Sequence, residues 1–449
     1  MSTVTSTTGT LSSAGIGSTL NVAGIVSQLM TTEQGPLTSL QNQESSYKSK
    51  ISAYGSIQSS MTTFQTALTA LGTGLNAQTA VSSDAATVSA TTSSDAASGS
   101  YAINVTRLAS ADKQISTTGL PAATTLAAAS MSITVGTGTA ITIPSANYSI
   151  KTLAAAINAA GAGVTASVIN DGSKNYLSLT SLSSGASNGI TVEATGDLEQ
   201  FATANMKDTA GQDAELTIDG VKVTKPSNNI SDAISGLTLN LTKVSAADTN
   251  TTISVTRDDT TIKANIGKFV TAYNTLTSTV KKLTAYDLST STAAALNGDS
   301  SITSLLSQLG RAVSSNVDGG GAMNSLAAIG ITRASDGTLS VDDTKLSAAL
   351  KSNAGGVANL FNGTNGIGTA MSTIAKDANS TTGVLASKQS TFAARVKTLQ
   401  TREDAESTRL ENVQAAYQAK FSALDTLMAS MTTTSSYLTQ QIAAMSANN

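Results

Sequence analysis

The side chains available for chemistry are carboxylates, amines, phenols and hydroxyls, because the 449-residue sequence contains no Cys, His or Trp. Without imidazole or thiol groups there is no histidine base, no cysteine nucleophile and no His/Cys metal site. A serine nucleophile needs a base beside it, and histidine, the usual one, is missing. Disulfide bonds are excluded as well. We therefore expect no enzymatic activity, no cofactor and no metal ion.

Two kinds of short motif could still hold a ligand. The glycines of Gly15–Gly17 and Gly136–Gly138 lack the third glycine of a dinucleotide fingerprint, and no GxxxxGK[ST] phosphate loop is present. We interpret them as a flexible connection and a turn. The adjacent carboxylates Asp258-Asp259 and Asp342-Asp343 could bind a cation, but neighbouring residues of a strand point to opposite faces. They are interpreted as surface acids at strand or helix ends, with Asp342 as a helix N-cap.

Charge and composition indicate an exported protein. Lys plus Arg is 26 and Asp plus Glu is 29, and no basic run exists, so nucleic-acid binding is not expected. No stretch approaches the roughly 20 apolar residues of a membrane helix. Residues 1–20 are rich in Ser, Thr and Gly and lack Lys and Arg, unlike a Sec signal peptide. We expect secretion by a route without a cleaved signal; a low-complexity cytoplasmic protein is the alternative.

Apolar residues recur every seven positions near both ends of the sequence, which predicts two long helices. Residues three and four apart share a helix face, so such rows form a coiled-coil seam that needs a partner helix. The pattern leaves two interpretations open: an intramolecular bundle, or a coiled coil that also docks neighbouring subunits. The first helix is predicted from 36 to 75. The rows are Leu40, Tyr47, Tyr54, Met61, Leu68 and Leu75 with Ile57, Phe64 and Leu71, and then Val396, Leu410, Tyr417, Leu424, Met431, Leu438 and Met445, interrupted at Glu403.

Most of the local charge of the C-terminal segment lies between Lys397 and Glu411. We interpret these residues as a solvated helix flank with pairs four residues apart.

Between residues 77 and 260 the period changes from helical to alternating, which predicts strands. Asp219-Gly220 is a strong hairpin signal, and Ile150–Ala160 is the one helical stretch within the unit Met131–Val192. Further helices are predicted over 262–283 and over 305–313, the latter ended by Asp318–Gly321, and a small hairpin around Asp336-Gly337. The predicted class is α+β: long N- and C-terminal helices paired as a coiled coil or helical bundle leg, with discontinuous β-rich head domains inserted.

The sequence also carries motifs that resemble the bacterial flagellar filament cap family, hook-associated protein 2 (FliD). The matches are ordered from residue 15 to 440, and the unit Met131–Val192 is similar to an insertion motif of flagellins and hook-associated proteins. Asn21 departs from the family, which often has an acidic residue there. The matching segments are Gly15–Ser18, Ile25–Met30 with Glu33, Pro36-Leu37, Ile51–Gly55, Phe269-Val270, Ala272–Asn274, Gly330–Thr332, Asp336–Leu339, Phe421–Asp425, Met428, Met431 and Ser435–Leu438.

The resemblance implies a domain arrangement. A terminal coiled-coil domain takes residues 1–40 and 425–449, and a helical leg domain takes 41–76 and 261–424. A β-rich head domain takes 77–115 and 206–260, and a second one with the insertion motif takes 116–205. We also expect residues 1–35 and 430–449 to be poorly ordered in an isolated subunit, because their partners are absent.

The resemblance further implies a cap at the distal tip of the flagellar filament, outside the cell. Its partners would be its own copies in a ring of five or six, flagellin, the type III export apparatus and an export chaperone. Alternatives are another flagellar axial protein, at the hook–filament junction or like flagellin, and a tip adhesin whose β head binds a host surface. Tyr54, Met61, Phe64, Phe269 and Tyr273 are expected in the core. The expected assembly seam is Val26, Leu29, Met30, Leu40, Tyr47, Tyr54, Tyr417, Leu424, Met431 and Leu438.

Overall fold

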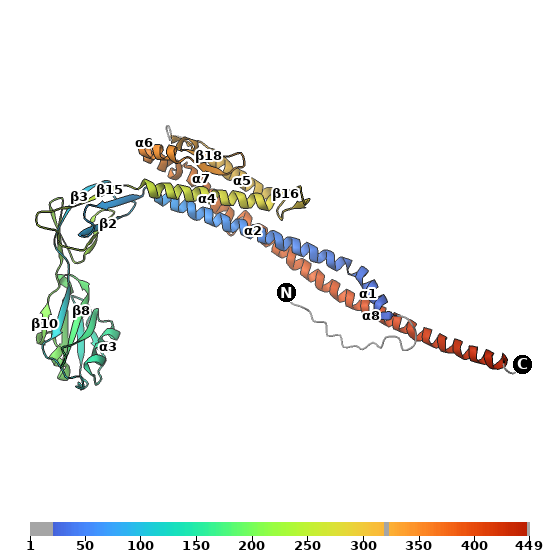
Figure 1. Ribbon diagram of the computed structural model, residues 1–449, viewed down its shortest axis with the longest axis horizontal. Helices are drawn as coiled ribbons and strands as arrows, with labels where there is room; N and C mark the ends of the chain where they lie inside the picture. Colours follow the sequence, from blue (N-terminus) through green and yellow to red (C-terminus); the bar gives the residue numbers. More distant parts are fainter. Residues whose placement is uncertain (1–20, 318–322, 447–449) are drawn as a thin grey trace. The chain divides into compact units, whose positions relative to one another are not determined.

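The computed structural model describes residues 21–317 and 323–446. The chain forms two compact units, one built from residues up to 69 together with those from 267 onward, and the other from residues 70–266. Figure 1 shows that the first unit is mostly helical and the second mostly β-stranded, which confirms the predicted α+β class. Among the described residues no helix has both the length and the hydropathy needed to cross a membrane.

The two ends of the chain are long helices, as the heptad rows predict, and α2 and α8 lie side by side in Figure 1. A further helix, α1, precedes α2, and Gln34 separates the two. The helices are α1 (Val22–Glu33), α2 (Gly35–Gly74), α4 (Asp259–Thr284), α5 (Ser300–Val313), α6 (Asp343–Asn362), α7 (Ile367–Asn379) and α8 (Val384–Ser446), and two small hairpins join β16 (Tyr286–Asp287) to β17 (Thr292–Ala293) and β18 (Ile331–Arg333) to β19 (Leu339–Val341).

The core of the helical unit is aromatic where α2 meets α4. Tyr54, Met61, Phe64, Phe269 and Tyr273 are each at most 1% exposed, so their prediction as core residues is confirmed. The Phe64 ring centroid lies 6.0 Å from those of Phe269 and Tyr273. Such ring pairs add to the free energy gained by burial alone. The heptad row therefore packs within the chain over this part of α2.

Two helix ends in this unit test the capping predictions. The Asp342 carboxylate accepts hydrogen bonds from the Thr344 and Lys345 amides, which confirms it as the N-cap of α6. Helix α5 ends at Val313, the last residue of the predicted helix, and Ser314 is its cap. The segment Asp318–Gly321, which was expected to end this helix, lies within residues 318–322, outside the described residues.

In the β-rich unit, strands begin at Gln78 and end at Arg257. The first of its two hydrophobic cores lies between a five-stranded antiparallel sheet and a three-stranded one, with orders β1-β15-β3-β11-β12 and β13-β14-β2. Asp219 and Gly220 both have positive φ, 48° and 84°, as the predicted two-residue hairpin requires. The strands are β1 (Gln78–Ser82), β2 (Val88–Thr92), β3 (Gly99–Arg107), β11 (Ala214–Ile218), β12 (Val221–Lys225), β13 (Asn229–Ile234), β14 (Leu237–Leu241) and β15 (Thr251–Arg257).

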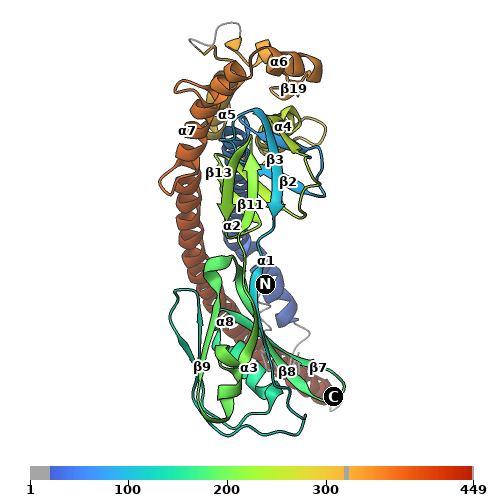
Figure 2. The ribbon, with the colours of Figure 1, turned by 90° about the vertical axis from the view of Figure 1, so that its left-hand side faces the viewer.

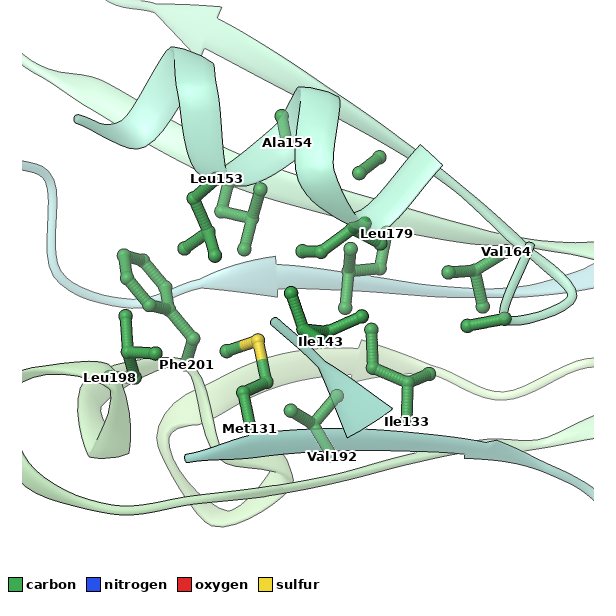
Figure 3. Close-up of a cluster of buried hydrophobic side chains, with 14 of the residues drawn as sticks. Met131, Ile133, Ile143, Leu153, Ala154, Val164, Leu179, Val192, Leu198 and Phe201 are labelled. Atoms are coloured by element: carbon green, nitrogen blue, oxygen red, sulfur yellow. The ribbon is translucent and has the colours of Figure 1, made fainter. Parts of the chain in front are cut away.

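The second core lies under α3 (Ile150–Ala160), which has the predicted bounds. Its Ser149–Thr152 capping box and left-handed Gly161 explain where it begins and ends. Figure 2 shows α3 against β7 and β8, and Figure 3 shows Met131, Leu153 and Phe201 converging below it. The strands are β4 (Ala111–Ser116), β5 (Met131–Val135), β6 (Ile141–Ile143), β7 (Val164–Asn170), β8 (Asn175–Ser184), β9 (Ile190–Ala194) and β10 (Met206–Thr209), in sheets ordered β10-β4-β8-β7 and β6-β5-β9.

The chain passes between these two β modules at Ser110 and Gln212. The Ser110 amide donates to the Gln212 carbonyl at 2.9 Å, and the Gln212 amide returns a bond of 3.1 Å. Both β4 and β10 pair in the second module, so the crossing lies a few residues from the limits of 115 and 206 expected from the sequence. We call residues 109–114, 184–190 and 208–213 the joint.

Candidate functional site

The N-terminal helix α1 packs on α8 through a small apolar cluster. Val26, Met30 and Leu410 are buried, with exposed fractions of 3%, 7% and 6%, and Tyr417 and Phe421 are half-buried around them. The helix begins at Val22, and the side-chain oxygen of its N-cap, Asn21, accepts a hydrogen bond of 2.9 Å from the Gly24 amide. Asn and Asp are equally good N-caps, so the departure from the family at this position leaves the helix start intact.

Arg409 on α8 forms an ion pair with α1 beside this apolar cluster. Its guanidinium lies 3.1 Å from the Glu33 carboxylate on α1 and 2.9 Å from Glu406 on its own helix. Hydrogen bonds to Glu406 and Glu33 raise the pKa of Arg409. The Tyr417 hydroxyl also donates to Glu33, at 3.3 Å. The interpretation of these charges as a solvated flank was therefore incomplete, because Arg409 and Tyr417 converge on one carboxylate of the other helix.

Tyr47 and Tyr54 line the contact between α2 and α8. The Phe392 ring centroid lies 5.7 Å from that of Tyr47 and 5.9 Å from that of Tyr54. The Tyr54 hydroxyl donates a hydrogen bond of 2.6 Å to Asp299, and burial raises the pKa of Tyr54. Burial opposes the charge on Asp299, but bonds from the Tyr54 hydroxyl and the Ser301 amide outweigh it and lower the pKa of that carboxyl. In this structure both tyrosines pack within the chain.

The interruption of the heptad row at Glu403 is a polar layer in the helix pair. Burial and the nearby Glu44 carboxylate raise the pKa of Glu403. Glu44 itself accepts from Lys48 at 2.9 Å and from the Gln400 amide at 2.7 Å. A polar layer in a helix seam selects one register over shifted ones, at some expense of stability.

Leu40 borders an open groove further along the helix pair. The groove is lined by Leu40 and Pro36 on α2 and by Arg402 and Ala405 on α8. It is shallow, whereas ligand pockets enclose most of the molecule that they bind.

Beyond Phe421 the last part of α8 has no other described helix or strand beside it, as Figure 1 shows. From 426 to 446 the sequence has no charged residue. Several hydroxyls there bond to carbonyls of their own helix; Thr426 donates to the Ser422 carbonyl and Thr432 to that of Met428. We call this stretch, 423–446, the terminal segment. Its exposed apolar side chains, between 41% and 71% accessible, are Leu424, Leu427, Met428, Met431, Tyr437, Leu438, Ile442 and Met445.

The structure thus divides the expected seam into three groups. Val26, Met30 and Tyr417 meet where α1 crosses α8, with Leu29 37% exposed beside them. Leu40, Tyr47 and Tyr54 lie along α2. Leu424, Met431 and Leu438 lie on the terminal segment and are 42%, 64% and 55% exposed. The N-terminal helix meets α8 around 410–421, upstream of the segment 425–449 expected to pair with residues 1–40, of which residues 1–20 lie outside the described residues.

Sequence reasoning missed Phe392, Asp299 and the ion pair of Glu33 with Arg409. Opposite charges on two helices expected to pair are a signal for the last of these. No local pattern points to Asp299, because its partner Tyr54 is 245 positions away.

Comparisons with known proteins cover nearly the whole chain. Residues 18–112 and 211–433 match the family models of the flagellar hook-associated protein 2 N-terminus and C-terminus, and residues 130–183 match the flagellin hook IN motif. Flagellar hook-associated protein 2 of Escherichia coli is 38% identical over 96% of this chain and 98% of that protein. The B-type flagellar hook-associated protein 2 of Pseudomonas aeruginosa is 31% identical over 96% of this chain and 98% of that protein. A crystal structure of the D1-D2-D3 domains of the Escherichia coli flagellar cap protein FliD has a TM-score of 0.64 and 36% identity, covering 76% of this chain and 99% of that one.

Proposed function

Because the chain belongs to the flagellar hook-associated protein 2 family and is a flagellar filament cap protein, we propose that several copies of it form a ring at the distal tip of the filament. There the ring promotes the polymerisation of exported flagellin and prevents its leakage. The family is a structural one, not a family of enzymes, and we propose no catalytic role.

The observation that carries this proposal is the terminal segment. A monomeric protein rarely exposes a continuous row of large apolar side chains, so such a row marks a surface for association. Its position at the end of a single helix suits insertion among other helices. We propose that Leu424, Met431 and Leu438, together with Val26, Leu29 and Met30, form the terminal leg that enters the filament end.

The hydroxyls of the terminal segment support burial against several neighbours. Burying a polar group without a partner is costly, but a hydroxyl that already bonds to its own helix carries a smaller penalty. Thr426, Thr432, Thr433 and Thr434 are all bonded in this way. The segment can therefore be enclosed by flagellin or by other copies of the chain without leaving these groups unpaired.

Two further partners follow from the family. We propose export through the flagellar type III apparatus with the help of a chaperone. No observation favours the alternatives, which are an axial protein at the hook–filament junction, a flagellin-like protein and a tip adhesin. The matched regions at both ends of the chain are those of the cap family.

The test is deletion of the gene in the native bacterium, with the culture medium assayed for monomeric flagellin. Capping predicts abundant soluble flagellin and short or absent filaments, restored by the wild-type gene. Filaments of normal length without leakage would contradict the proposal. Measuring the mass of the purified protein tests the ring separately from the capping role. If the protein were a strict monomer and still prevented the leakage of flagellin, only the proposal of a ring would be contradicted.

A further inference from the structure

A short hairpin at the end of α4 presents a leucine to solvent. It joins β16 to β17, and Figure 1 shows β16 directly after α4. We call residues 285–294 the α4 hairpin. Leu288 at its tip is 85% exposed, the largest fraction among the large apolar side chains of the described residues, and Tyr286 is 51% exposed. Single exposed leucines are common on protein surfaces, so the local structure decides whether this exposure has a function.

The α4 hairpin is fixed at its base and strained at its tip. The Ala294 amide donates to the Ala285 carbonyl at 2.9 Å. The Leu296 amide donates to the Leu283 carbonyl, also at 2.9 Å, and the Leu296 side chain is buried. At the tip, Ser291 has a φ of 53°, a left-handed conformation that is unfavourable for a residue with a Cβ. Such strain is found where a backbone conformation serves a function, and here it holds the exposed tip in place.

The exposed face of α4 beside this hairpin carries a groove of about 460 Å³. Its lining residues recur three and four positions apart, so they share one side of the helix. We call this surface the α4 groove. It is lined by Thr271, Asn274, Thr275, Ser278, Thr279 and Lys282.

Most hydroxyl and amide groups of the α4 groove are already paired within the chain. The Thr271 and Thr275 hydroxyls each donate a bond of 2.9 Å to a carbonyl of their own helix. The Asn274 side chain bonds to both backbone groups of one residue of β19. The Thr279 hydroxyl accepts from Ser60 on α2 at 3.3 Å. An apolar side chain can therefore enter the α4 groove without leaving these groups unpaired.

The α4 hairpin and the α4 groove carry opposite charges. Asp287 is the only charged residue between positions 283 and 298, and Lys282 is the only one that lines the groove. Hydrogen bonds from the Ser289 hydroxyl and amide lower the pKa of Asp287 to about 2, so this carboxylate is negative in neutral medium. Lys282 forms no salt bridge within the described parts of the chain. The hairpin of another copy would bring it an acidic partner.

We propose that the α4 hairpin of one copy docks in the α4 groove of a second copy, with Leu288 against the groove and Asp287 near Lys282. The inference rests on the ring proposed above and assigns to it a contact between neighbouring helical units. Because the two surfaces differ, the contact is head-to-tail, the kind that can close into a ring but not into a two-fold dimer.

The positions of the two surfaces along α4 suit such a ring. Ser278, in the middle of the α4 groove, lies six residues before the end of the helix at Thr284, a distance of about 9 Å. Groove and hairpin therefore lie at nearly the same level. Copies related by rotation about an axis along α4 keep that level, so the hairpin of each can meet the groove of the next.

The first test is cross-linking of full-length chains through engineered thiols, which is specific because the sequence has no cysteine. Chains with Leu288→Cys, mixed with differently tagged chains with Ser278→Cys and a short bis-maleimide, should give a covalent mixed dimer. The control replaces Ser278→Cys by Ala264→Cys. Ala264 is exposed on α4 about 21 Å from Ser278 and outside the groove, so the mixed dimer should fall to background.

The second test removes the contact without a cross-linker. Because Leu288 is largely exposed, Leu288→Asp should melt like the wild type, but its oligomer should dissociate in analytical ultracentrifugation at concentrations where the wild type stays assembled. Leu182→Asp adds the same charge at a leucine of β8 that is 70% exposed, and it should assemble like the wild type. Lys282→Glu sets two negative charges against each other, so its loss of assembly should be larger at low salt than at high salt.

Two results would overturn the contact while the capping role stands. One is equal cross-linking of Leu288→Cys to Ser278→Cys and to Ala264→Cys, and the other is a Leu288→Asp protein that assembles like the wild type. A wild type that is a strict monomer, without any cross-linked product, would contradict both the contact and the ring. The deletion experiment tests the capping role separately, because its readout is flagellin in the medium.

Discussion

Replacing Leu438 by Asp separates assembly from folding. Leu438 is 55% exposed in the isolated chain, so the substitution removes little native packing and should change the free energy of unfolding by no more than about 0.5 kcal/mol. Full burial of a leucine is worth about 1.5–3 kcal/mol, so covering its exposed half on assembly gains roughly 1 kcal/mol per subunit. An unpaired carboxylate in the same contact costs several kcal/mol instead.

The combined loss of about 4 kcal/mol corresponds to roughly a thousandfold weaker contact. The assay is complementation of the deletion strain, with soluble flagellin in the medium and filament length as readouts and the melting temperature of the purified protein beside them. Leu438→Asp should leak flagellin as the deletion does and melt like the wild type. Leu410→Asp, at a buried position under α1, should lower the melting temperature.

A matched variant tests whether the effect depends on the apolar face of the helix or only on the added charge. Gln440 lies 200° around the helix from Leu438, so Gln440→Asp adds the same charge away from the apolar row. It should complement better than Leu438→Asp does. Normal capping by Leu438→Asp would refute the assignment of the terminal segment, and a large drop in its melting temperature would refute the claim that this side chain is unpartnered in the monomer.

Two further substitutions test local features of the fold. Tyr54→Phe removes the hydroxyl that donates to Asp299 and should lower the free energy of unfolding by about 1.5–3 kcal/mol in denaturant titrations; Tyr437→Phe at an exposed position should change it little, and equal effects would show that the buried bond contributes nothing special. Gly220 and Gly236 both have positive φ, so alanine at Gly220 should cost about 1–2 kcal/mol. Alanine at Gly236 should cost clearly more, since its Cβ would also overlap a neighbouring backbone segment; the reverse order would contradict this packing.

Much of the fold could be predicted because its signals are local. Leu68, Leu71 and Leu75 repeat at the spacing of a helix face, and they lie buried on α2 or at its end. The alternation of apolar residues around Asp219-Gly220 predicts a hairpin, and its two-residue turn requires the positive φ that both residues have. Ser149 and Gly161 cap the two ends of α3. They are also local signals, because a cap depends on residues within four positions of it.

The assembly site could be predicted only in part. The heptad row through Leu424, Met431 and Leu438 indicates a helix face that needs a partner, and in the structure this face is exposed. Upstream in the same row, Leu410 is covered by α1 of the same chain. Periodicity alone cannot separate these two cases, because a side chain covered by its own chain and one left for another subunit obey the same spacing.

The sequence by itself determined the elements: their type, many of their ends, and the absence of histidine and thiol chemistry. Tertiary structure alone decided which elements meet. It paired β1 with β15 across more than 160 positions, set α1 on Leu410, and brought Tyr54 to Asp299. It also buried the polar side chains of Asp112 and Gln114 on β4. The physical reason is that hydrogen bonding within a turn or helix depends on neighbours in sequence, whereas burial and charge depend on segments that only the folded chain brings together.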